Sequence, residues 1–367
     1  MLRAHDLVTV QPFEGAANKT AAVVLRKCQK TRYPVPYTVW TRKEGVGKIP
    51  TGLKWREAVR LLARTKLLAE PMGSPTGSWQ TLGQSQKRLR AIQGVNAYQA
   101  RRGASTEPYG VFWLDVKQVL SDRNLIVRNL TEMGKRKIQQ IQERVEPDLV
   151  FPAVRGADIE RWRATPGIFV LMTQDPKTCE PYPQAEMKSR WPRTFGYLTR
   201  FKDVLLSRGS RTVRELAERT EFYSMFGIGL YTVARYKVVW KRMASDLVAA
   251  VISQHKTPFG FKTVIPTDTT SLFATDNEDE AHYLCAIINS TPVRDFIKSY
   301  SSAGRGFAAP SAMNPVGILK FDPKSKLHHG LAELSKTLHR LTAQDKAEEA
   351  TKLEKALDRR VSKLFGL

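Results

Sequence analysis

The pattern of apolar and polar positions along the chain predicts a mixed α/β fold of short strands and helices. Short apolar runs bounded by turn-forming residues are typical of strands. Such runs occur at residues 7–10, 20–25, 111–119, 168–172, 236–240, 247–252 and 263–265. Helices are predicted within residues 52–70, where apolar residues follow helical spacing, and around residues 135–144.

The first two predicted strands, 7–10 and 20–25, are joined by a turn at Phe13-Glu14-Gly15 and therefore form a hairpin. An isolated hairpin is only marginally stable in water. We therefore expect this hairpin to join a larger sheet, supplied either by later segments or by a partner chain.

A further helix is expected to begin near Asp276, a good N-cap residue. Acidic residues at 278, 279 and 280 fall in its first turn, where carboxylates interact favourably with the helix dipole. We interpret this acidic cluster as a helix start rather than as a metal site.

The end of the chain carries a leucine seam at helical spacing, at residues 327, 331, 334, 338 and 341, which resumes at 353, 357, 361 and 364. This pattern predicts a C-terminal helical hairpin or a docking helix. Packing on its own domain is favoured over a dimerising coiled coil, because the heptads are few.

The net charge of the chain is more informative about its partner than any motif. The chain holds 59 lysines and arginines against 35 acidic residues, a net charge of +24, with a pI near 10.0. Such an excess calls for a polyanionic partner. A stretch long enough to span a membrane and a secretory leader are both lacking, so a cytoplasmic protein is expected. The scattered cysteines and histidines predict neither disulfides nor a metal site.

Catalytic motifs are incomplete. Phe226-Gly227-Ile228-Gly229 is similar to a cofactor loop for S-adenosylmethionine, but it precedes a predicted strand and favours a turn. Asn314-Pro315-Val316 lacks the second proline and the ring of the motif that holds a flipped adenine. Asp148 with Glu186 and Lys188 can be fitted to a nuclease pattern, yet so many lysines make such a match easy by chance. No catalytic or cofactor-binding residue is assigned.

Two segments concentrate the positive charge. Residues 185–215 hold eight basic and three acidic side chains with interleaved aromatics, which suits phosphate contact and either core packing or base stacking. For the aromatics, core packing is favoured. Residues 235–262 hold six basic side chains and one acidic one. Arg242, Gln254 and Lys256 are candidate base readers, although phosphate contact is the commoner role of such residues.

Several segments together resemble the target-recognition region of adenine-specific (N6) DNA methyltransferases from restriction-modification and phage-exclusion systems. Residues 151–162, Phe-Pro-Ala-Val-Arg-Gly-Ala-Asp-Ile-Glu-Arg-Trp, resemble the entry into that region. Residues 236–242 look like its central strand, residues 283–290 like its helix ending in Leu-Asn-Ser, and residues 357–367 like its final helix. Residues 12–15 and 20–27 look like the last hairpin of a methyltransferase catalytic sheet.

The resemblance implies a division into a catalytic-sheet remnant (1–45), a connecting α/β segment (46–150), a target-recognition domain (151–325) and C-terminal helices (326–367). It implies double-stranded DNA as partner, with S-adenosylmethionine bound by a separate catalytic chain, because the cofactor loop and the adenine-binding motif are absent here. Within the first motif, Gly156 is expected at a turn, Arg155 or Arg161 at a phosphate, and Asp158 alternatively at a helix cap. The candidate DNA-binding residues are Arg155, Arg161, Arg163, Lys188, Arg190, Arg193, Arg208, Arg211, Lys241, Arg242, Gln254, Lys256, Lys262 and Arg305.

Two other functions stay open. One is a non-catalytic specificity or assembly subunit whose main partner is a protein that docks on the terminal helices. The other is a metal-dependent DNA nuclease.

Overall fold

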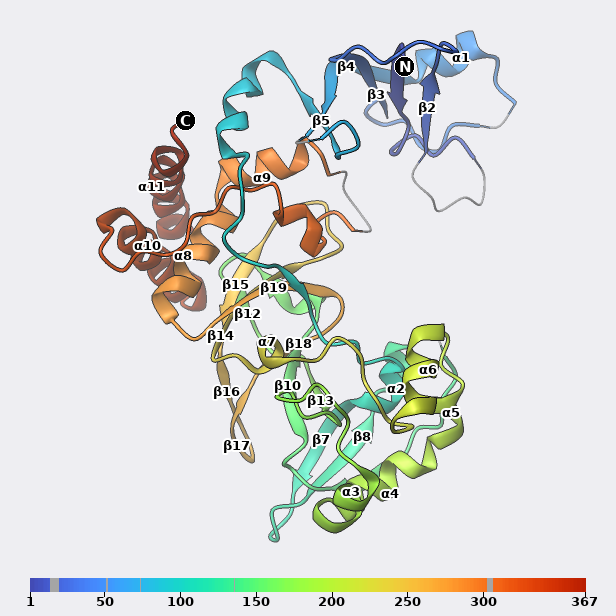
Figure 1. The fold of residues 1–367 in the computed structure, drawn as a ribbon, viewed down its shortest axis with the longest axis vertical. Coiled ribbons are helices and arrows are strands. Elements are labelled where there is room, and N and C mark those ends of the chain that lie inside the picture. Colours follow the sequence, from blue (N-terminus) through green and yellow to red (C-terminus); the bar gives the residue numbers. More distant parts are fainter. Residues whose placement is uncertain (14–19, 51, 73, 135, 302–305) are drawn as a thin grey trace. The chain divides into compact units, whose positions relative to one another are not determined.

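The computed structural model describes residues 1–13, 20–50, 52–72, 74–134, 136–301 and 306–367. The chain forms two compact units (Figure 1). Unit 1 comprises residues 1–91 with 298–300, and unit 2 comprises residues 92–297 with 301–367. The mixed α/β class predicted from the sequence is confirmed.

Unit 1 is built on a five-stranded sheet with the order β2-β1-β3-β4-β5. Its strands are β1 (Arg3–Asp6), β2 (Ala21–Val24), β3 (Val35–Arg42), β4 (Leu62–Pro71) and β5 (Trp79–Leu82). β1 runs parallel to β3, and the other neighbours are antiparallel. The predicted hairpin is present, and later segments extend it into a sheet. Its first strand is Arg3–Asp6 rather than residues 7–10, and the predicted turn falls largely outside the described residues.

The helix predicted within residues 52–70 is wrong. Only the short helix α1 (Trp55–Arg60) forms there, and β4 follows it. β4 pairs with β3 over eight residues, from Val35 opposite Ala69 to Arg42 opposite Leu62, and with β5 on its other edge. These ladder hydrogen bonds on two sides override the helical spacing of the leucines, because tertiary pairing outweighs intrinsic propensity.

Unit 2 contains a six-stranded sheet with the order β18-β10-β13-β7-β8-β9. Its strands are β7 (Trp113–Val119), β8 (Leu125–Asn129), β9 (Gln142–Val145), β10 (Val150–Val154), β13 (Ile168–Leu171) and β18 (Ile265–Pro266). The helices α2 (Tyr109–Phe112), α3 (Gln184–Arg190), α4 (Pro192–Arg200), α5 (Lys202–Leu206) and α6 (Arg211–Arg219) belong to the same lobe (Figure 1). Its core joins strand residues such as Val127 and Val170 to helix residues such as Tyr197 and Leu205.

The helix predicted around residues 135–144 is also wrong: the described part of this segment is extended and ends in β9. Asn129, fully buried, explains this. Its amide group donates to the carbonyls of Gly110 and Gln139 and accepts from the Ile141 amide at 2.7 Å. These bonds use the backbone groups that a helix would need.

The second sheet of unit 2 has the order β15-β14-β19-β6. Its strands are β6 (Arg101–Arg102), β14 (Tyr236–Lys241), β15 (Ala249–Ile252) and β19 (Thr270–Thr275). Strands predicted at 168–172, 236–240 and 247–252 are thus confirmed as β13, β14 and β15. Residues 263–265 are divided between β17 and β18, and residues 111–119 between α2 and β7.

Helix α8 (Glu278–Asn289) packs between this sheet and the C-terminal helices, so its residues 280–289 are all buried. Its N-cap is Asn277 rather than Asp276, and the Asn277 side chain accepts from the Glu280 amide at 3.1 Å. The helices α9 (Thr291–Lys298), α10 (Lys326–Ala343) and α11 (Ala347–Phe365) follow. α10 and α11 form the predicted helical hairpin, which packs on its own domain through α8.

Small elements complete the described fold. Two two-stranded sheets pair β11 (Ile159–Glu160) with β12 (Arg163–Ala164) and β16 (Gln254–Thr257) with β17 (Gly260–Thr263). Helix α7 (Leu230–Val233) precedes β14. Short 3-10 turns lie at Gln84–Ile92, Thr131–Met133, Gly156–Asp158 and Pro310–Met313. Within the described residues, every helix is too short or too polar to cross a lipid bilayer.

The last residue of α8, Asn289, takes the place of a neighbouring strand at the edge of the second sheet. Its carboxamide accepts from the Ala249 amide and donates to the Ala249 carbonyl, both at 2.8 Å, and it is 1% exposed. Ala249 lies in edge strand β15. Its carbonyl also accepts from the Trp162 amide at 3.0 Å, whereas its amide is bonded by the Asn289 side chain.

Replacing Asn289 with alanine is expected to lower the free energy of unfolding by about 1–3 kcal/mol, because the buried Ala249 amide loses its partner while the Ala249 carbonyl keeps the Trp162 amide. Urea unfolding followed by tryptophan fluorescence measures this loss. The control is Asn124→Ala, since the exposed Asn124 side chain bonds only within its own turn, and it is expected to change stability by less than about 0.5 kcal/mol. Equal effects of the two substitutions would contradict the strand-substitute role.

Candidate nucleic-acid interface

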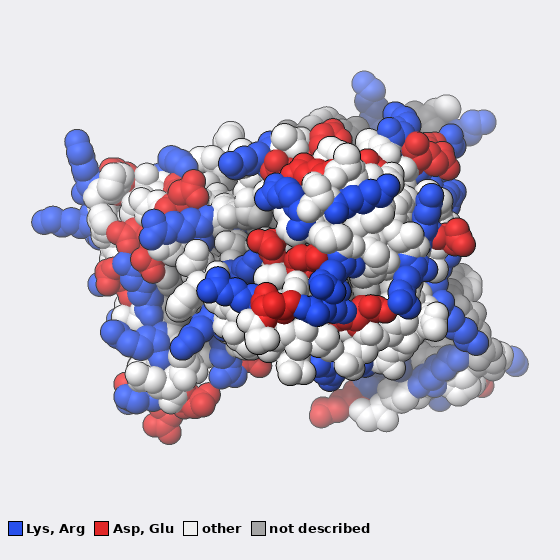
Figure 2. Space-filling model, turned by 90° about the horizontal axis from the view of Figure 1, so that it is seen from below, with Lys and Arg blue, Asp and Glu red and all other residues white. Residues whose placement is uncertain are grey.

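The positive charge of the chain is dispersed. Figure 2 shows lysine and arginine side chains over the whole visible face, with acidic side chains between them. Several candidate DNA-binding arginines are in ion pairs: Arg163 with Glu160 at 2.5 Å, Arg190 with Glu186 at 2.6 Å and Arg211 with Glu215 at 2.7 Å. Net charge alone therefore does not locate an interface, and the role of each basic residue depends on its contacts.

Arg161 and its neighbour Trp162 join two of the motifs that carry the family resemblance, residues 151–162 and 283–290, to the last helix. Arg161 donates to the Asn289 carbonyl at the end of α8 and forms an ion pair with Glu354 of α11 at 3.1 Å. The indole of Trp162 donates to the same Glu354 carboxylate at 2.6 Å. We call Arg161, Trp162, Asn289 and Glu354 the motif junction. The predicted phosphate-contact candidate Arg161 thus serves as a helix C-terminal cap and a link between helices.

Arg155 is held by Asp158. Its guanidinium donates two hydrogen bonds to that carboxylate, at 2.6 and 2.8 Å, and the Arg155 amide donates a third at 2.8 Å. This contact raises the pKa of Arg155, mainly through the hydrogen bonds to Asp158. Gly156 is needed for close approach, since a Cβ there would lie 3.0 Å from the Thr269 carbonyl oxygen. The motif is therefore a rigid turn in which Asp158 does the capping that was expected as an alternative.

Two further candidates, Arg208 and Lys262, donate hydrogen bonds to backbone carbonyls of the protein itself. Arg208 is 4% exposed and donates to the carbonyls of three residues of its own lobe, at 2.5–2.8 Å. Burial lowers its pKa to about 10. Lys262 donates to the carbonyls of Pro147 and Asp148 at 2.9 and 3.1 Å, and burial lowers its pKa as well. Both cations neutralise backbone dipoles inside the fold.

The helical cluster at 185–215 has its aromatics in the core, as favoured from the sequence. Trp191, Tyr197 and Phe201 are at most 4% exposed. The cations lie outside: Arg190 stacks 4.2 Å from the Trp191 ring centre, and the Lys188 ammonium lies 5.3 Å from that of Phe195. Arg193 is exposed on the same helix pair. These aromatics support cations from beneath and are not available for base stacking.

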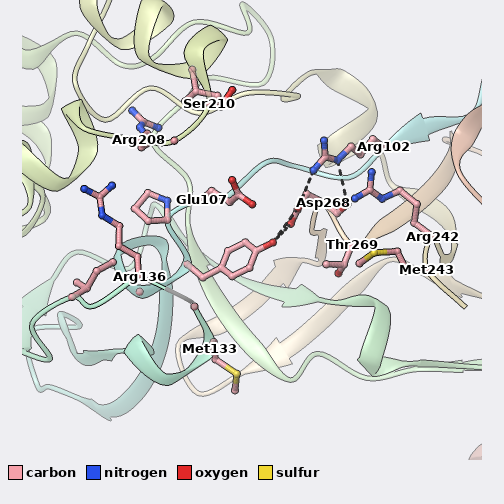
Figure 3. A pocket seen from close by; sticks show the side chains of 17 residues that line it. Arg102, Glu107, Met133, Arg136, Arg208, Ser210, Arg242, Met243, Asp268 and Thr269 are labelled. Atoms are coloured by element: carbon pink, nitrogen blue, oxygen red, sulfur yellow. Dashed lines mark hydrogen bonds and ion pairs between the residues drawn. The ribbon is translucent and has the colours of Figure 1, made fainter. Parts of the chain in front are cut away.

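A central pocket of about 630 Å³ opens in unit 2, shown in Figure 3. Arg102 and Arg242 lie on one side of it, and Arg136 and Arg208 lie on the other, with Glu107 between them. Asp268, 3% exposed, accepts from Arg102 at 2.9 Å and from the Tyr109 hydroxyl at 3.0 Å. The pocket is thus a cationic hollow whose one buried carboxylate is already neutralised.

Tyr109 also forms the floor of this pocket. Its ring stacks on Trp113, with ring centres 3.9 Å apart and an angle of 11° between planes. Burial, followed by the charge of Asp268, raises the pKa of Tyr109 well above its ordinary value, so the hydroxyl remains a donor at neutral pH. Sequence reasoning missed Arg102, Tyr109 and Asp268, because they come from separate segments and match no motif.

The hairpin formed by β16 and β17 projects beyond the second sheet (Figure 1). Gln254 pairs with Thr263 and Lys256 with Phe261 across it, so these four side chains share one face. Gln254, Lys256 and Phe261 are exposed. We call this side the presented face. The predicted base readers Gln254 and Lys256 therefore do lie together, two residues apart on one strand.

At the base of the hairpin lies an open recess of about 660 Å³, which Gln254 and Thr263 line together with Tyr231 and Arg235. Two arginines lie beside it. Arg101 lies 5.5 Å from the Tyr231 ring centre, and Arg235 lies 5.4 Å from that of Tyr236. Arg101 and Arg235 are exposed and continue the polar surface of the presented face.

Lys237 does not belong to this surface, although the sequence placed it in the second basic cluster. It is fully buried in β14, and its ammonium donates to the Ala234 carbonyl at 2.8 Å. Burial lowers its pKa from 10.5 to about 7. Lys241 at the end of the same strand is half-buried, Arg242 lines the central pocket, and Arg305 lies outside the described residues.

Two of the catalytic patterns considered in the sequence, at residues 226–229 and 314–316, lie in a turn and a loop. Gly227 has a φ of +71° and Gly229 caps the four-residue helix α7, so residues 226–229 form a turn between α6 and this short helix, with β14 following only after it. Pro310–Met313 and the turn after it place Asn314 and Pro315 in a loop. Among the described residues, no group of three or more His, Cys, Asp and Glu side chains is arranged to hold a metal ion.

Comparison with known proteins gives similarity only at the level of solved structures. No protein-family model matches the chain, and no curated protein sequence matches it. One similar structure is the Type IIL restriction-modification enzyme MmeI in complex with DNA, with a TM-score of 0.47, 11% identity, and coverage of 90% of this chain and 47% of that one. Another is the type IIG restriction endonuclease BpuSI, with a TM-score of 0.34, 13% identity, and coverage of 75% and 31%. The chain thus spans about half and about a third of these two chains.

The buried lysine gives a pH prediction. In the unfolded chain the Lys237 ammonium titrates near its ordinary value of about 10.4, whereas in the folded state it releases its proton near pH 7. Between these values the unfolded state binds more protons, so stability rises with pH and is lost as pH falls toward 7. Lys237→Met is expected to be more stable than the parent at pH 7 and to lose this slope.

Urea unfolding at a series of pH values between 7 and 9.5 measures the difference between parent and variant. The matched control is Lys256→Met on the exposed face, which should keep the parent's pH slope. Parallel curves for the parent and Lys237→Met would show that the lysine is charged in the folded protein.

Proposed function

We propose that this chain recognises the DNA target for an adenine-specific DNA methyltransferase of a restriction-modification or phage-defence system. In this proposal the residues that bind S-adenosylmethionine and extrude the adenine are supplied by another chain. The observation that carries the proposal is the presented face of the β16–β17 hairpin, where Gln254 and Lys256 are exposed on one strand beside an open recess lined in part by Arg235. The resemblance of residues 151–162, 236–242 and 283–290 to the family supports it.

The geometry of the hairpin suits groove reading. The major groove of B-DNA admits a two-stranded β-ribbon, and glutamine and lysine are the side chains that pair with adenine and guanine edges there. Residues 254 and 256 are about 7 Å apart along a strand, which corresponds to two base-pair steps. The exposed Arg101 and Arg235 at the hairpin base are placed to hold phosphates alongside.

The contacts also separate cations that bind DNA from cations that build the fold. Arg161 and Arg208 donate to carbonyls of the protein, Arg155 donates to Asp158 and Lys262 bonds to the loop at 147–148. In the proposal these residues position the reading elements. The central pocket, with Arg102, Arg136 and Arg242 around it, provides a second cationic region for the DNA backbone.

The first test is duplex binding as a function of salt. The purified chain is expected to bind a random-sequence 30-base-pair duplex with an affinity that falls steeply as salt rises, because each neutralised phosphate releases counterions. Lys256→Ala should lower the slope of log affinity against log salt by about 1. Lys352→Ala, which removes the same charge from the exposed side of α11, is the matched control and should leave the slope unchanged. A salt-independent affinity, or equal slopes for both variants, would count against the hairpin as the reading element.

The second test concerns the cofactor. Titration of the purified chain with S-adenosylmethionine in a calorimeter is expected to give no binding heat, because residues 226–229 follow helix α6 rather than a strand and lead only into the four-residue helix α7. Stoichiometric binding would place the methyl donor on this chain and overturn the assignment of catalysis to a partner.

A further inference from the structure

One side chain on the presented face has no role in the proposed reading of base edges. Phe261 of β17 is 68% exposed and lies directly opposite Lys256. Residues 254–263 contain two lysines and a histidine but no acidic residue. An aromatic ring therefore stands in a cationic, solvent-facing position on a projecting ribbon (Figure 1).

The opposite face of the hairpin is anchored. The Lys262 ammonium bonds to the carbonyls of Pro147 and Asp148 and lies 4.8 Å from the ring centre of Phe151. Phe259, in the turn, packs against Phe169 of the six-stranded sheet, with ring centres 5.6 Å apart. These contacts fix the rear face of the hairpin to the core of unit 2.

The turn before Phe261 is also fixed. The Thr257 hydroxyl donates to the Gly260 carbonyl at 2.7 Å and accepts from the Phe259 amide at 3.3 Å. Gly260 has a φ of +119°, a conformation open to glycine and strained for other residues. These contacts set the direction of β17, so the phenyl ring is held outward by the backbone rather than by side-chain packing.

We propose that Phe261 is a wedge that enters between stacked base pairs of the duplex when the hairpin lies in the groove. The inference rests on the proposed function, since it assigns a further role to the same DNA-reading face. Apolar side chains inserted at a base step partly unstack it and kink or unwind the duplex. The Lys256 ammonium beside the ring neutralises phosphate charge drawn closer by the distortion, and the anchored rear face supplies the rigidity that insertion needs.

If Phe261 instead contacted a protein partner, it would not change the linking number of bound DNA. This difference gives a direct test. The full chain is bound to closed circular plasmid DNA, the plasmid is relaxed with a topoisomerase, and the linking number is measured after the protein is removed. Insertion of a wedge unwinds the duplex, so the parent chain is expected to lower the linking number in proportion to the protein bound.

Phe261→Ala is expected to lose most of this change and to weaken duplex binding by about tenfold, the scale of one aromatic–base contact, while its salt slope stays that of the parent. Phe261→Leu, which keeps an apolar wedge, should retain part of the unwinding. The matched control is Phe13→Ala, which removes a ring that is 64% exposed in unit 1. It should behave as the parent does.

The outcomes separate the two proposals. DNA binding by the parent with no change in linking number, or equal unwinding by the parent and Phe261→Ala, overturns the wedge and leaves target recognition standing. Absence of any duplex binding by the parent overturns both. Because Phe261 is exposed, its replacement does not threaten folding, and a circular dichroism spectrum identical to that of the parent verifies this.

Discussion

The two hydrogen bonds between the Asn289 carboxamide and the backbone of Ala249 are the contact on which the architecture of unit 2 depends most. They let a helix end serve as the neighbour of an edge strand, and they bring the end of α8 to the place where Arg161 and Glu354 meet. Through this one place the turn at 155–162, the buried helix and the last helix are held together. Two of the resemblance motifs, residues 151–162 and 283–290, are therefore neighbours in space.

That arrangement clarifies why the net charge of a strongly basic chain overstates the number of cations that are free to bind a partner. Burying a guanidinium is costly unless its donors find acceptors, and Arg208 meets that condition with backbone carbonyls from the end of α5 and from residues 222–224. Such a residue adds to the net charge but is committed to the fold. The hairpin divides the two roles within one small element: Lys262 faces inward to carbonyls, whereas Lys256 on the other side of the ribbon faces solvent.

Local patterns were sufficient for the parts of the fold that are buried on all sides or along one clear seam. The strands at 168–172 and 236–240 and the terminal helices were predicted because their apolar residues have no alternative environment. β4 and the segment before β9 were not, because their conformation is decided by partners far away in the sequence: β3 for the first, and the side chain of Asn129 for the second. The contacts of the arginines were not predicted from the sequence for the same reason. Asp268 lies 159 positions from Tyr109 and 166 from Arg102, and no spacing rule reaches that far.

The composition of unit 1 has a consequence for the order in which the chain folds. Strand β5 donates hydrogen bonds to residue 299: the Thr81 amide donates to the Ser299 carbonyl at 2.7 Å, and Gln80 donates to the Ser299 hydroxyl at 3.0 Å. The acceptor residue, Ser299, lies more than 200 positions after β5 in the sequence. Because a chain is synthesised from its N-terminus, these contacts of β5 can form only after residues 92–297 of unit 2 have been made, whereas the pairing of β5 with β4 needs no later residue.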